Sequence, residues 1–300
     1  MKYPKVYIVI LNWNGLTDTI ECIESLRRMR YPNFRILVVD NDSSDNDVEL
    51  LKEAYKDYIQ IFKCNDNLGY AGGNNAGIKI SLEQNADFVL ILNNDTTVEP
   101  DLLEELIKKY RTDNELGMVA PLINYYTDPH RIWSAGGRLS KIRGSGFAYS
   151  AMLETEIGKS AKVVTFISGC CMLVKKEVFQ KVGLFDESFF LYIEDTDFCY
   201  RVLTEGYKLC FTPATKIYHK VKSTTGKNSS TLPLYYETRN RLYFAKKNFR
   251  GIHILTTLYI FITMILKSVI WLFQGKIENI STVQKSFEDY LKDNMGKREI

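Results

Sequence analysis

Short apolar runs and amphipathic stretches alternate through the first half of the chain. The apolar runs are rich in β-branched residues, and they predict buried strands at 6–11, 34–39, 59–64 and 88–92. The stretches between them carry apolar residues at helical spacing and predict helices at 20–26, 49–55, 75–84 and 100–110. This alternation predicts an α/β fold with a mostly parallel sheet, right-handed crossovers and flanking helices.

Asp18 and Glu21 stand at the expected start of the first helix. An acidic residue followed three positions later by glutamate has the pattern of a capping box, in which each side chain bonds a free backbone amide. We therefore expect both carboxylates to cap this helix.

The alternation ends after the apolar run at 118–123. Residues 134–149 are rich in glycine, arginine and aromatic residues and predict hairpins or loops. Farther along, the pattern predicts strands at 163–167, 170–174, 208–211 and 215–218, and a helix at 196–205. The second half of the chain is therefore expected to be organised differently from the first.

Residues 252–273 are strongly apolar and are interrupted by His253 and Lys267. Their length just suffices to span a bilayer, but a lysine near the middle argues against a simple transmembrane helix. A helix lying on a membrane surface, or partly inserted, is the preferred interpretation, and a core or oligomer helix is the alternative. With the polar tail from Gln274, residues 223–300 are expected to form a helical appendage.

Composition is that of an ordinary globular protein. The 300 residues are 45% hydrophobic and 25% charged, which suits one large α/β domain with an appendage or two small domains. The net charge of +3 gives no support for a nucleic-acid partner, and none is expected. Residues 216–250, however, contain nine basic residues and one acidic residue, which suits a diphosphate, an acidic membrane surface or a solvated basic face.

The cysteines and the N-terminus bear on the cellular compartment. Six cysteines occur without a CxxC pair, so neither a zinc site nor a disulfide framework is indicated. Reduced, buried thiols are typical of cytosolic proteins. The first four residues lead into a strand without a signal peptide, so the active unit is expected in the cytoplasm.

Polar residues gather where the four N-terminal strands end. Asn12 and Asn14 follow the first strand, Asp40 the second, residues 65–74 the third and residues 93–95 the fourth. Ligands of open α/β sheets bind at the carboxyl ends of the strands. Four strand ends with amides, carboxylates and glycines therefore predict one ligand site.

The residue types at these ends suit a nucleotide and a metal ion. Asp40 can accept a hydrogen bond from the ring NH of uracil or thymine, although capping the next turn is its commoner use. The glycine-rich segment 67–75 leads into a helix whose amides can approach a phosphate, but it lacks the GxGxxG spacing of dinucleotide folds. Asp95 can ligate Mg²⁺ or Mn²⁺ and Asn94 can bond a ribose, unless residues 93–95 are simply a polar turn.

Two further candidates lie in the second half of the chain. Glu194 and Asp195 follow the aromatic run 189–192, and aromatic rings stack on sugars. A carboxylate there can act as the base that takes a proton from an acceptor hydroxyl, although acidic residues also commonly begin helices. His219 ends a strand and can complete a metal site as neutral imidazole, although a lone histidine there is usually a surface residue.

Together, these segments resemble the family-2 glycosyltransferases of GT-A fold, and among them the bacterial rhamnosyltransferase-like members. The resemblance spans residues 6–244 and rests on an ordered series of segments at 9–14, 38–44, 67–74, 93–95, 185–187, 192–197, 219 and 236–240. It implies a Rossmann-like central sheet in a catalytic unit at 1–222. Within that unit, residues about 1–123 would bind the nucleotide and about 124–222 the acceptor.

The resemblance also implies roles for individual residues. Asp195 would be the catalytic base, and Asp95 with His219 would hold Mg²⁺ or Mn²⁺ across the donor diphosphate. Substrate contacts are implied for Asn12, Asp40, Asn41, Gly69, Gly72, Asn74, Asn94, Trp133, Glu194 and Arg239. Asp40 and Asn12 would meet the pyrimidine, and Arg239 would meet phosphate or acceptor.

The metal turn departs from the family pattern. Many relatives carry two acidic residues there, whereas Asn93 and Asn94 are neutral. We therefore expect weaker metal binding in the absence of nucleotide, because the diphosphate must supply much of the negative charge.

The implied function is inverting transfer of a sugar from a nucleoside-diphosphate sugar, with dTDP-L-rhamnose favoured. The acceptor would be a glycan or lipid-linked hydroxyl in bacterial cell-surface polysaccharide synthesis. UDP-hexose or UDP-N-acetylhexosamine donors and a non-catalytic sugar-nucleotide-binding subunit stay open. A sugar-nucleotide pyrophosphorylase is disfavoured, because no glycine- and arginine-rich loop follows the first strand.

The appendage bears on where the protein acts. It is expected to be cytoplasmic and peripheral, at the inner face of the cell membrane. A homodimer through the C-terminal helices is the alternative use of the apolar stretch.

Overall fold

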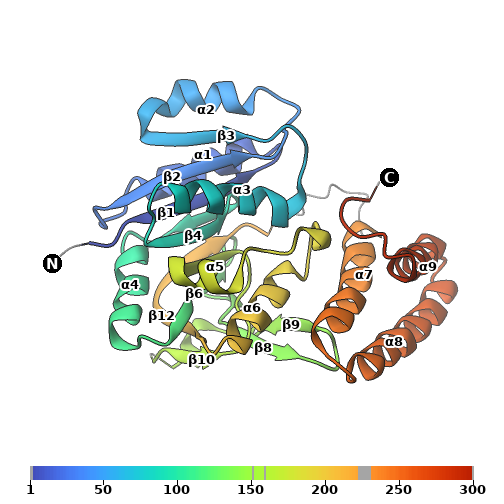
Figure 1. Ribbon diagram of the computed structural model, residues 1–300. Helices are drawn as coiled ribbons and strands as arrows, with labels where there is room; N and C mark the ends of the chain where they lie inside the picture. The colour runs from blue at the N-terminus through green and yellow to red at the C-terminus, as the bar shows by residue number, and fades with distance from the viewer. Residues whose placement is uncertain (1–2, 151, 159, 222–230, 299–300) are drawn as a thin grey trace.

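The computed structural model describes residues 3–150, 152–158, 160–221 and 231–298. Within these residues a ten-stranded sheet forms the centre, and helices α7 to α9 lie together at one end (Figure 1). The strands are β1 (Val6–Asn12), β2 (Phe34–Asp40), β3 (Ile59–Lys63), β4 (Phe88–Asn93), β5 (Thr96–Val98), β6 (Leu116–Tyr125), β7 (Ile132–Ser134), β8 (Gly137–Ser140), β9 (Ser145–Ala148), β10 (Lys162–Val164), β11 (Cys171–Lys175) and β12 (Lys208–His219). The helices are α1 (Leu16–Leu26), α2 (Asp47–Tyr55), α3 (Gly69–Glu83), α4 (Leu102–Thr112), α5 (Lys176–Val182), α6 (Glu194–Thr204), α7 (Thr231–Asn248), α8 (His253–Phe273) and α9 (Ile277–Leu291).

Strands β4, β1, β2 and β3 lie side by side and run parallel, as the strand–helix alternation predicts. Their register aligns Asn12 with Asp40 and Leu11 with Asn93, so the polar residues that follow lie along one edge. In the other half of the sheet, β12 is parallel to β6, whereas β11 is antiparallel to both β6 and β4. The expected α/β architecture is therefore confirmed, with a mixed second half.

Alternate side chains of the strands enter two apolar cores, one on each face of the sheet. Ile8 and Ile10 belong to the core covered by α1, α2 and α4, whereas Val9 and Val39 belong to the core covered by α3, α5 and α6. Burial on both faces explains why these strands are continuous apolar runs in the sequence.

Helix α3 begins at Gly69, six residues before the expected start at Asn75. The glycine-rich segment is therefore largely helical. It can be so because the helix lies very close to the sheet, where a Cβ on Gly73 would strike Leu11 and one on Gly77 would strike Val9. Close packing thus outweighs the low helix propensity of glycine.

The strands expected at 208–211 and 215–218 are one strand, β12. Its register with β6 shifts between Thr212 and Lys216, around Pro213. Proline has no amide hydrogen for the ladder, so an irregularity there lets the strand continue to His219.

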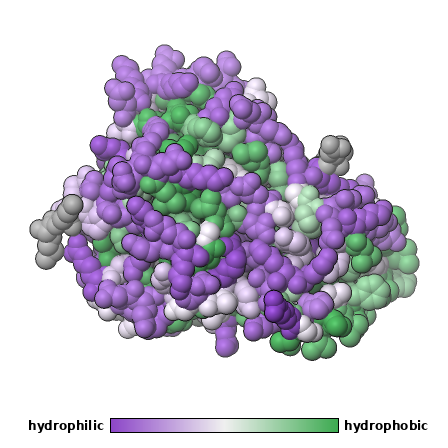
Figure 2. Space-filling view, viewed as in Figure 1, coloured by the Kyte–Doolittle hydropathy of each residue, from purple (hydrophilic) through white to green (hydrophobic). Residues whose placement is uncertain are grey.

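Helices α7, α8 and α9 pack together around Leu242, Ile260, Met264 and Val283. Helix α8 is long and apolar enough, by length and composition, to cross a membrane. Its mean hydropathy is 1.9 over an 18-residue stretch, and 17% of that stretch is buried. Its outward side makes the apolar surface at that end of the molecule in Figure 2. The proposed boundary between residues 222 and 223 lies outside the described residues and stays a prediction.

Candidate active site

Asp95 and His219 meet where β4 and β12 end. The short strand β5 pairs antiparallel with the end of β12, which aligns Thr96 with His219, and the Lys220 amide donates to the Asp95 carbonyl at 2.9 Å. His219 Nε2 lies 3.1 Å from Asp95 Oδ1. The Trp133 ring packs edge-on against the imidazole, with centroids 4.5 Å apart. Two sequence-distant segments thus bring together the two expected metal ligands.

The spacing of this pair suits a shared divalent ion. Two ligands at right angles on an octahedral ion, each about 2.1 Å from it, are about 3 Å apart. His219 is buried, and its Nδ1 has no hydrogen-bond partner among the described residues. No cluster of three or more His, Cys, Asp or Glu ligands occurs in the described part of the chain.

Asp195 lies in the first turn of α6. Its Oδ2 accepts from the Gly169 amide at 3.0 Å, and its Oδ1 accepts from the Thr196 amide at 2.6 Å. Removal from water raises the pKa of this carboxyl, and the amide hydrogen bonds oppose the rise. The Asp195 carboxylate is thus fixed in position by two backbone amides and has a raised pKa, which suits a general base.

Glu194 precedes Asp195 and is almost fully buried. Its Oε2 has no hydrogen-bond partner among the described residues. Burial, and then the charge of Asp195, hold the pKa of Glu194 well above its usual range. Burial therefore favours the neutral form of the Glu194 carboxyl, whereas two amide hydrogen bonds stabilise the Asp195 carboxylate.

These groups share one cavity. A space of about 500 Å³ is lined by Asp95, Trp133, Glu194, Asp195 and His219. A second cavity, of about 200 Å³, is lined by Asn41, Gly69, Asn94 and Asp95 with the rings of Trp13, Tyr70, Phe190 and Tyr192. Both are bounded by Tyr70, Asn93, Asp95, Leu191 and Tyr192. Asp95, of the expected metal pair, therefore lies where the larger cavity, which contains Asp195, meets the smaller, aromatic cavity.

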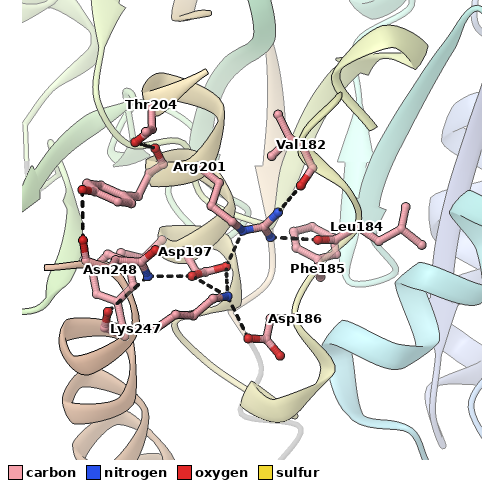
Figure 3. A network of polar contacts seen from close by, with 12 residues as sticks. Val182, Leu184, Phe185, Asp186, Asp197, Arg201, Thr204, Lys247 and Asn248 are labelled. Atoms are coloured by element: carbon pink, nitrogen blue, oxygen red, sulfur yellow. Dashed lines mark hydrogen bonds and ion pairs between the residues drawn. The ribbon is translucent and has the colours of Figure 1, made fainter. Parts of the chain in front are cut away.

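Helix α6 is fixed by a buried ionic network around Asp197 (Figure 3). The Asp197 carboxylate, fully buried, accepts from Arg201 Nε at 2.7 Å and from Asn248 Nδ2 at 2.8 Å. Lys247 joins it at 3.0 Å and also bonds Asp186 at 2.8 Å. Because Lys247 and Asn248 belong to α7, the network ties the helix of Asp195 to the C-terminal region.

A sequence model described as glycosyl transferase family 2 matches residues 7–183, more than half of the chain. The chain belongs to glycosyl transferase family 2. It is 29% identical to the low-salt glycan biosynthesis hexosyltransferase Agl10 of Haloferax volcanii, over 97% of this chain and 92% of that protein. It is 24% identical to the dTDP-rhamnosyl transferase RfbF of Shigella flexneri, over 81% of this chain and 80% of that one. The N-acetylglucosaminyl-diphospho-decaprenol L-rhamnosyltransferase of Mycobacterium tuberculosis is 25% identical, over 65% and 69%.

Solved structures agree on the fold. The mannosyltransferase PcManGT of Pyrobaculum calidifontis, solved with GDP-Man and Mn²⁺, superposes with a TM-score of 0.60 at 13% identity, over 98% of this chain and 88% of that chain. GalNAc-T7, solved with UDP, GalNAc and Mn²⁺, gives a TM-score of 0.64 at 16% identity, over 79% of this chain. This chain spans about half, 47%, of that protein. The GT-A fold expected from the sequence is thereby confirmed.

Two expected nucleotide contacts of this family-2 enzyme, Asn12 and Asp40, are fully buried. Asp40 Oδ1 accepts from the Ser43 amide at 3.1 Å, and its Oδ2 accepts from Asn12 at 2.9 Å. The structure thus shows the turn-capping use of Asp40. Asp40 lines neither cavity in this conformation, so its contact with the nucleobase stays a prediction.

The start of α3 is occupied by protein rather than open to a phosphate. The Phe190 carbonyl accepts from the Tyr70 amide at 2.7 Å and from the Ala71 amide at 3.3 Å. Gly69 has a φ of 70°, and a Cβ there would strike Phe190. Gly72 and Asn74 are buried in this helix and line neither of the two cavities, and Asn74 bonds the Tyr70 carbonyl. The first amides of α3 therefore bind a protein loop, contrary to the phosphate-binding interpretation of this segment.

The capping-box prediction for Asp18 and Glu21 is wrong. Helix α1 begins at Leu16, which puts Asp18 inside its first turn. Both carboxylates accept from Lys220 Nζ at 2.6 Å, and the Tyr126 hydroxyl also donates to Glu21. They fix α1 to the residue that follows His219, a long-range role that local sequence does not reveal.

Arg239 lines neither cavity. Its side chain is buried in α7, where it donates to the carbonyls of Gly296 at 3.0 Å and Asn294 at 3.3 Å. A guanidinium with these partners is not available to phosphate or acceptor in this conformation.

The basic excess at 216–250 is largely paired. Among its described members, Lys216 bonds Glu154, Lys246 bonds Asp293, and Lys220 and Lys247 have the acidic partners given above. These basic side chains therefore mostly form ion pairs between distant elements, and the segment presents less free positive charge than the sequence indicates.

Tyr70 and Leu191 are site residues that the sequence reasoning did not single out. Both line the two cavities, and the Tyr70 hydroxyl donates to the Gly169 carbonyl at 2.6 Å, beside the amide that holds Asp195. Tyr70 lies inside the glycine-rich motif and Leu191 inside the aromatic run. Their positions inside those two motifs were the sequence signal that could have identified them as cavity-lining residues.

Proposed function

We propose that the chain is an inverting, divalent-metal-dependent glycosyltransferase that moves a sugar from a nucleoside-diphosphate sugar to an acceptor hydroxyl. One observation carries the proposal: the Asp95–His219 pair and the Asp195 carboxylate line the same cavity. An ion on the pair can neutralise a leaving diphosphate. Asp195 can take the proton of the acceptor hydroxyl as that oxygen attacks the anomeric carbon from the opposite face. Asp95 and His219 would hold Mg²⁺ or Mn²⁺ there.

The smaller cavity suits the nucleotide. Its aromatic side chains can stack on a nucleobase, and Asn41 and Asn94 lie in its wall, where their NH₂ groups donate to protein acceptors. A dTDP or UDP donor is favoured, because thymine and uracil both carry a ring NH. That NH could donate a hydrogen bond to the Asp40 carboxylate once the carboxylate is exposed. The Mn²⁺ in two solved proteins of this fold supports the metal.

The favoured donor is dTDP-L-rhamnose, and a glycan or lipid-linked acceptor in cell-surface polysaccharide synthesis is favoured with it. Two relatives are named as rhamnosyltransferases, one of them acting on a decaprenol-linked sugar. The rival is a UDP-hexose or UDP-N-acetylhexosamine, since other relatives are named as a hexosyltransferase and a poly-N-acetylglucosamine synthase.

A thermal-shift screen of nucleotide sugars with Mn²⁺ or Mg²⁺ tests the donor. The true donor is expected to raise the melting temperature most, since a ligand at 100 times its dissociation constant stabilises the folded state by about 2.7 kcal/mol. The largest shift with a guanine nucleotide would contradict the pyrimidine assignment. Binding without any hydrolysis or transfer of the sugar would favour a non-catalytic subunit.

We further propose that the protein is cytoplasmic and binds the inner face of the cell membrane through α8. Large apolar side chains on its outward side are about half exposed or more, including Leu258 at 52% and Leu266 at 60%. Arg250, Lys267 and Lys276 are exposed along or beside the helix, which suits anionic headgroups. Such a position would bring the active site near a lipid-linked acceptor.

Replacing Leu258 and Leu266 together with glutamate is expected to weaken binding to anionic phospholipid vesicles at least tenfold, because it puts two charges on the apolar face. Co-sedimentation measures the change. The control adds the same charge at exposed sites elsewhere, Gln60→Glu with Thr112→Glu, and should bind as wild type does.

Unchanged vesicle binding in the Leu258/Leu266 variant would contradict the membrane role. A wild-type dimer that becomes a monomer in this variant, without vesicle binding by either, would support the dimer alternative. These point changes are cleaner than deleting the chain from residue 252, because that deletion also removes the tail that bonds Arg239.

A further inference from the structure

Residues 189–193, here called the wall loop, are held in a strained backbone conformation. Phe190, Tyr192 and Ile193 have φ angles of 61°, 67° and 73°, in the left-handed region that disfavours non-glycine residues. The strain is greatest for Ile193, because it is β-branched. Leu191 and Tyr192 line both cavities, so the loop shapes the site directly. Strain of this kind persists only where surrounding groups enforce it.

One side chain of α7 bonds three carbonyls of the wall loop. Asn240 Nδ2 donates to the carbonyls of Phe189 at 2.8 Å, Leu191 at 2.8 Å and Tyr192 at 2.9 Å. Asn240 is fully buried, so these contacts are shielded from water. The Phe190 carbonyl is held by the first amides of α3, and the Ile193 carbonyl accepts from the Asp197 amide. The curled backbone thus directs three of the five loop carbonyls toward one amide donor.

Arg239 determines which way that amide faces. Its Nε donates to Asn240 Oδ1 at 3.1 Å, which leaves the NH₂ group directed at the loop. The guanidinium lies against Tyr235 and Tyr236, 5.2 and 5.0 Å from their ring centroids, and is bonded to the C-terminal tail. The Tyr236 ring in turn stacks on Phe190, with centroids 5.4 Å apart. These contacts join Tyr235, Tyr236, Arg239 and Asn240 into one packed group against the wall loop.

We propose that Asn240, oriented by Arg239, is a positioning residue that holds the wall loop in its strained form and so sets the shape of the substrate cavity. The effect on catalysis rests on the proposed function, whereas the effect on the loop does not. Asp195 is held separately, by the amides of Gly169 and Thr196. Loss of Asn240 should therefore impair substrate fit more than the chemical step.

The test compares Asn240→Ala with Thr238→Val by hydrogen–deuterium exchange. Thr238 is buried on the same helix, its hydroxyl has no partner among the described residues, and valine keeps its shape. Asn240→Ala is expected to raise exchange at least tenfold in peptides covering 187–193, where the Leu191 amide is bonded within the loop. Thr238→Val is expected to leave those peptides as in wild type.

Unchanged exchange of the wall loop in Asn240→Ala overturns the proposal, as does an increase spread equally over α6 and α7. If that variant does not fold, Arg239→Lys replaces it. That change keeps the charge but loses the planar fork that orients Asn240, so it should raise exchange of the same peptides to a smaller extent.

Steady-state kinetics give a second measurement once a donor is known. The fall in kcat/KM of Asn240→Ala is expected mainly in KM, by about tenfold or more. A fall confined to kcat would contradict the positioning role. Because exchange needs no substrate, a wild-type protein without transferase activity would refute the proposed function and leave the positioning of the loop intact.

Discussion

Replacing Asp195 with asparagine is expected to lower turnover about 10²- to 10⁴-fold, the usual contribution of a general base. Asparagine keeps the size of the side chain and can accept from one of the two amides that hold Asp195, that of Gly169, which should keep the α6 turn in place. Nucleotide binding should persist too, because Asp195 does not line the smaller cavity. The measurement is kcat for transfer beside the dissociation constant of the nucleoside diphosphate.

The matched control is Glu194→Gln. Burial raises the pKa of Glu194 well above its usual range, which favours the neutral carboxyl, and glutamine resembles that neutral form. Its loss of turnover should be much smaller than that of Asp195→Asn. The reverse order would move the base to Glu194, and full activity in Asp195→Asn would remove Asp195 from the mechanism.

The pH profile provides an independent check. A base works only when ionised, and removal from water raises the pKa of Asp195. The wild-type rate should therefore fall as pH falls through that raised pKa, on an acid limb that lies above the usual pKa of an exposed aspartate. In Asp195→Asn this limb should be absent from whatever activity remains.

Much of the fold follows from local patterns. The runs around Ile8, Leu37 and Leu90 are buried on both faces, so their apolar continuity predicts them as strands. The start of α3 was misplaced because its glycines pack against Leu11 and Val9, a long-range effect that outweighs propensity. The local sequence pattern thus predicts an element correctly where burial of its own side chains determines whether it is a strand or a helix.

The candidate site divides in the same way. Asp95, His219 and Asp195 are brought together as expected, because each stands where a strand ends or a helix begins and the sheet aligns those ends. Arg239 was misinterpreted because its partners, at Asn294 and Gly296, lie more than fifty residues farther along the chain. A local sequence pattern does not predict a contact between residues so far apart in the chain.

Asp95→Asn is expected to weaken joint binding of nucleoside diphosphate and Mn²⁺ at least tenfold, about 1.4 kcal/mol. Asp95 is the carboxylate of the proposed metal pair and also borders both cavities, so its charge is expected to act on ion and nucleotide together. Isothermal titration with UDP or dTDP, in the presence of Mn²⁺ or of a chelator, measures the loss. With the chelator, the variant and wild type should bind nucleotide nearly alike.

The neutral neighbours of Asp95 sharpen this experiment. Wild type is expected to bind Mn²⁺ weakly alone and much more tightly with nucleotide, and by linkage the ion must strengthen nucleotide binding by the same factor. Asn93 lines both cavities beside Asp95, so Asn93→Asp should tighten Mn²⁺ binding without nucleotide and reduce the coupling. Tight Mn²⁺ binding by wild type alone, with no gain from nucleotide, would contradict this account. The diphosphate would then not be the ligand that completes the site.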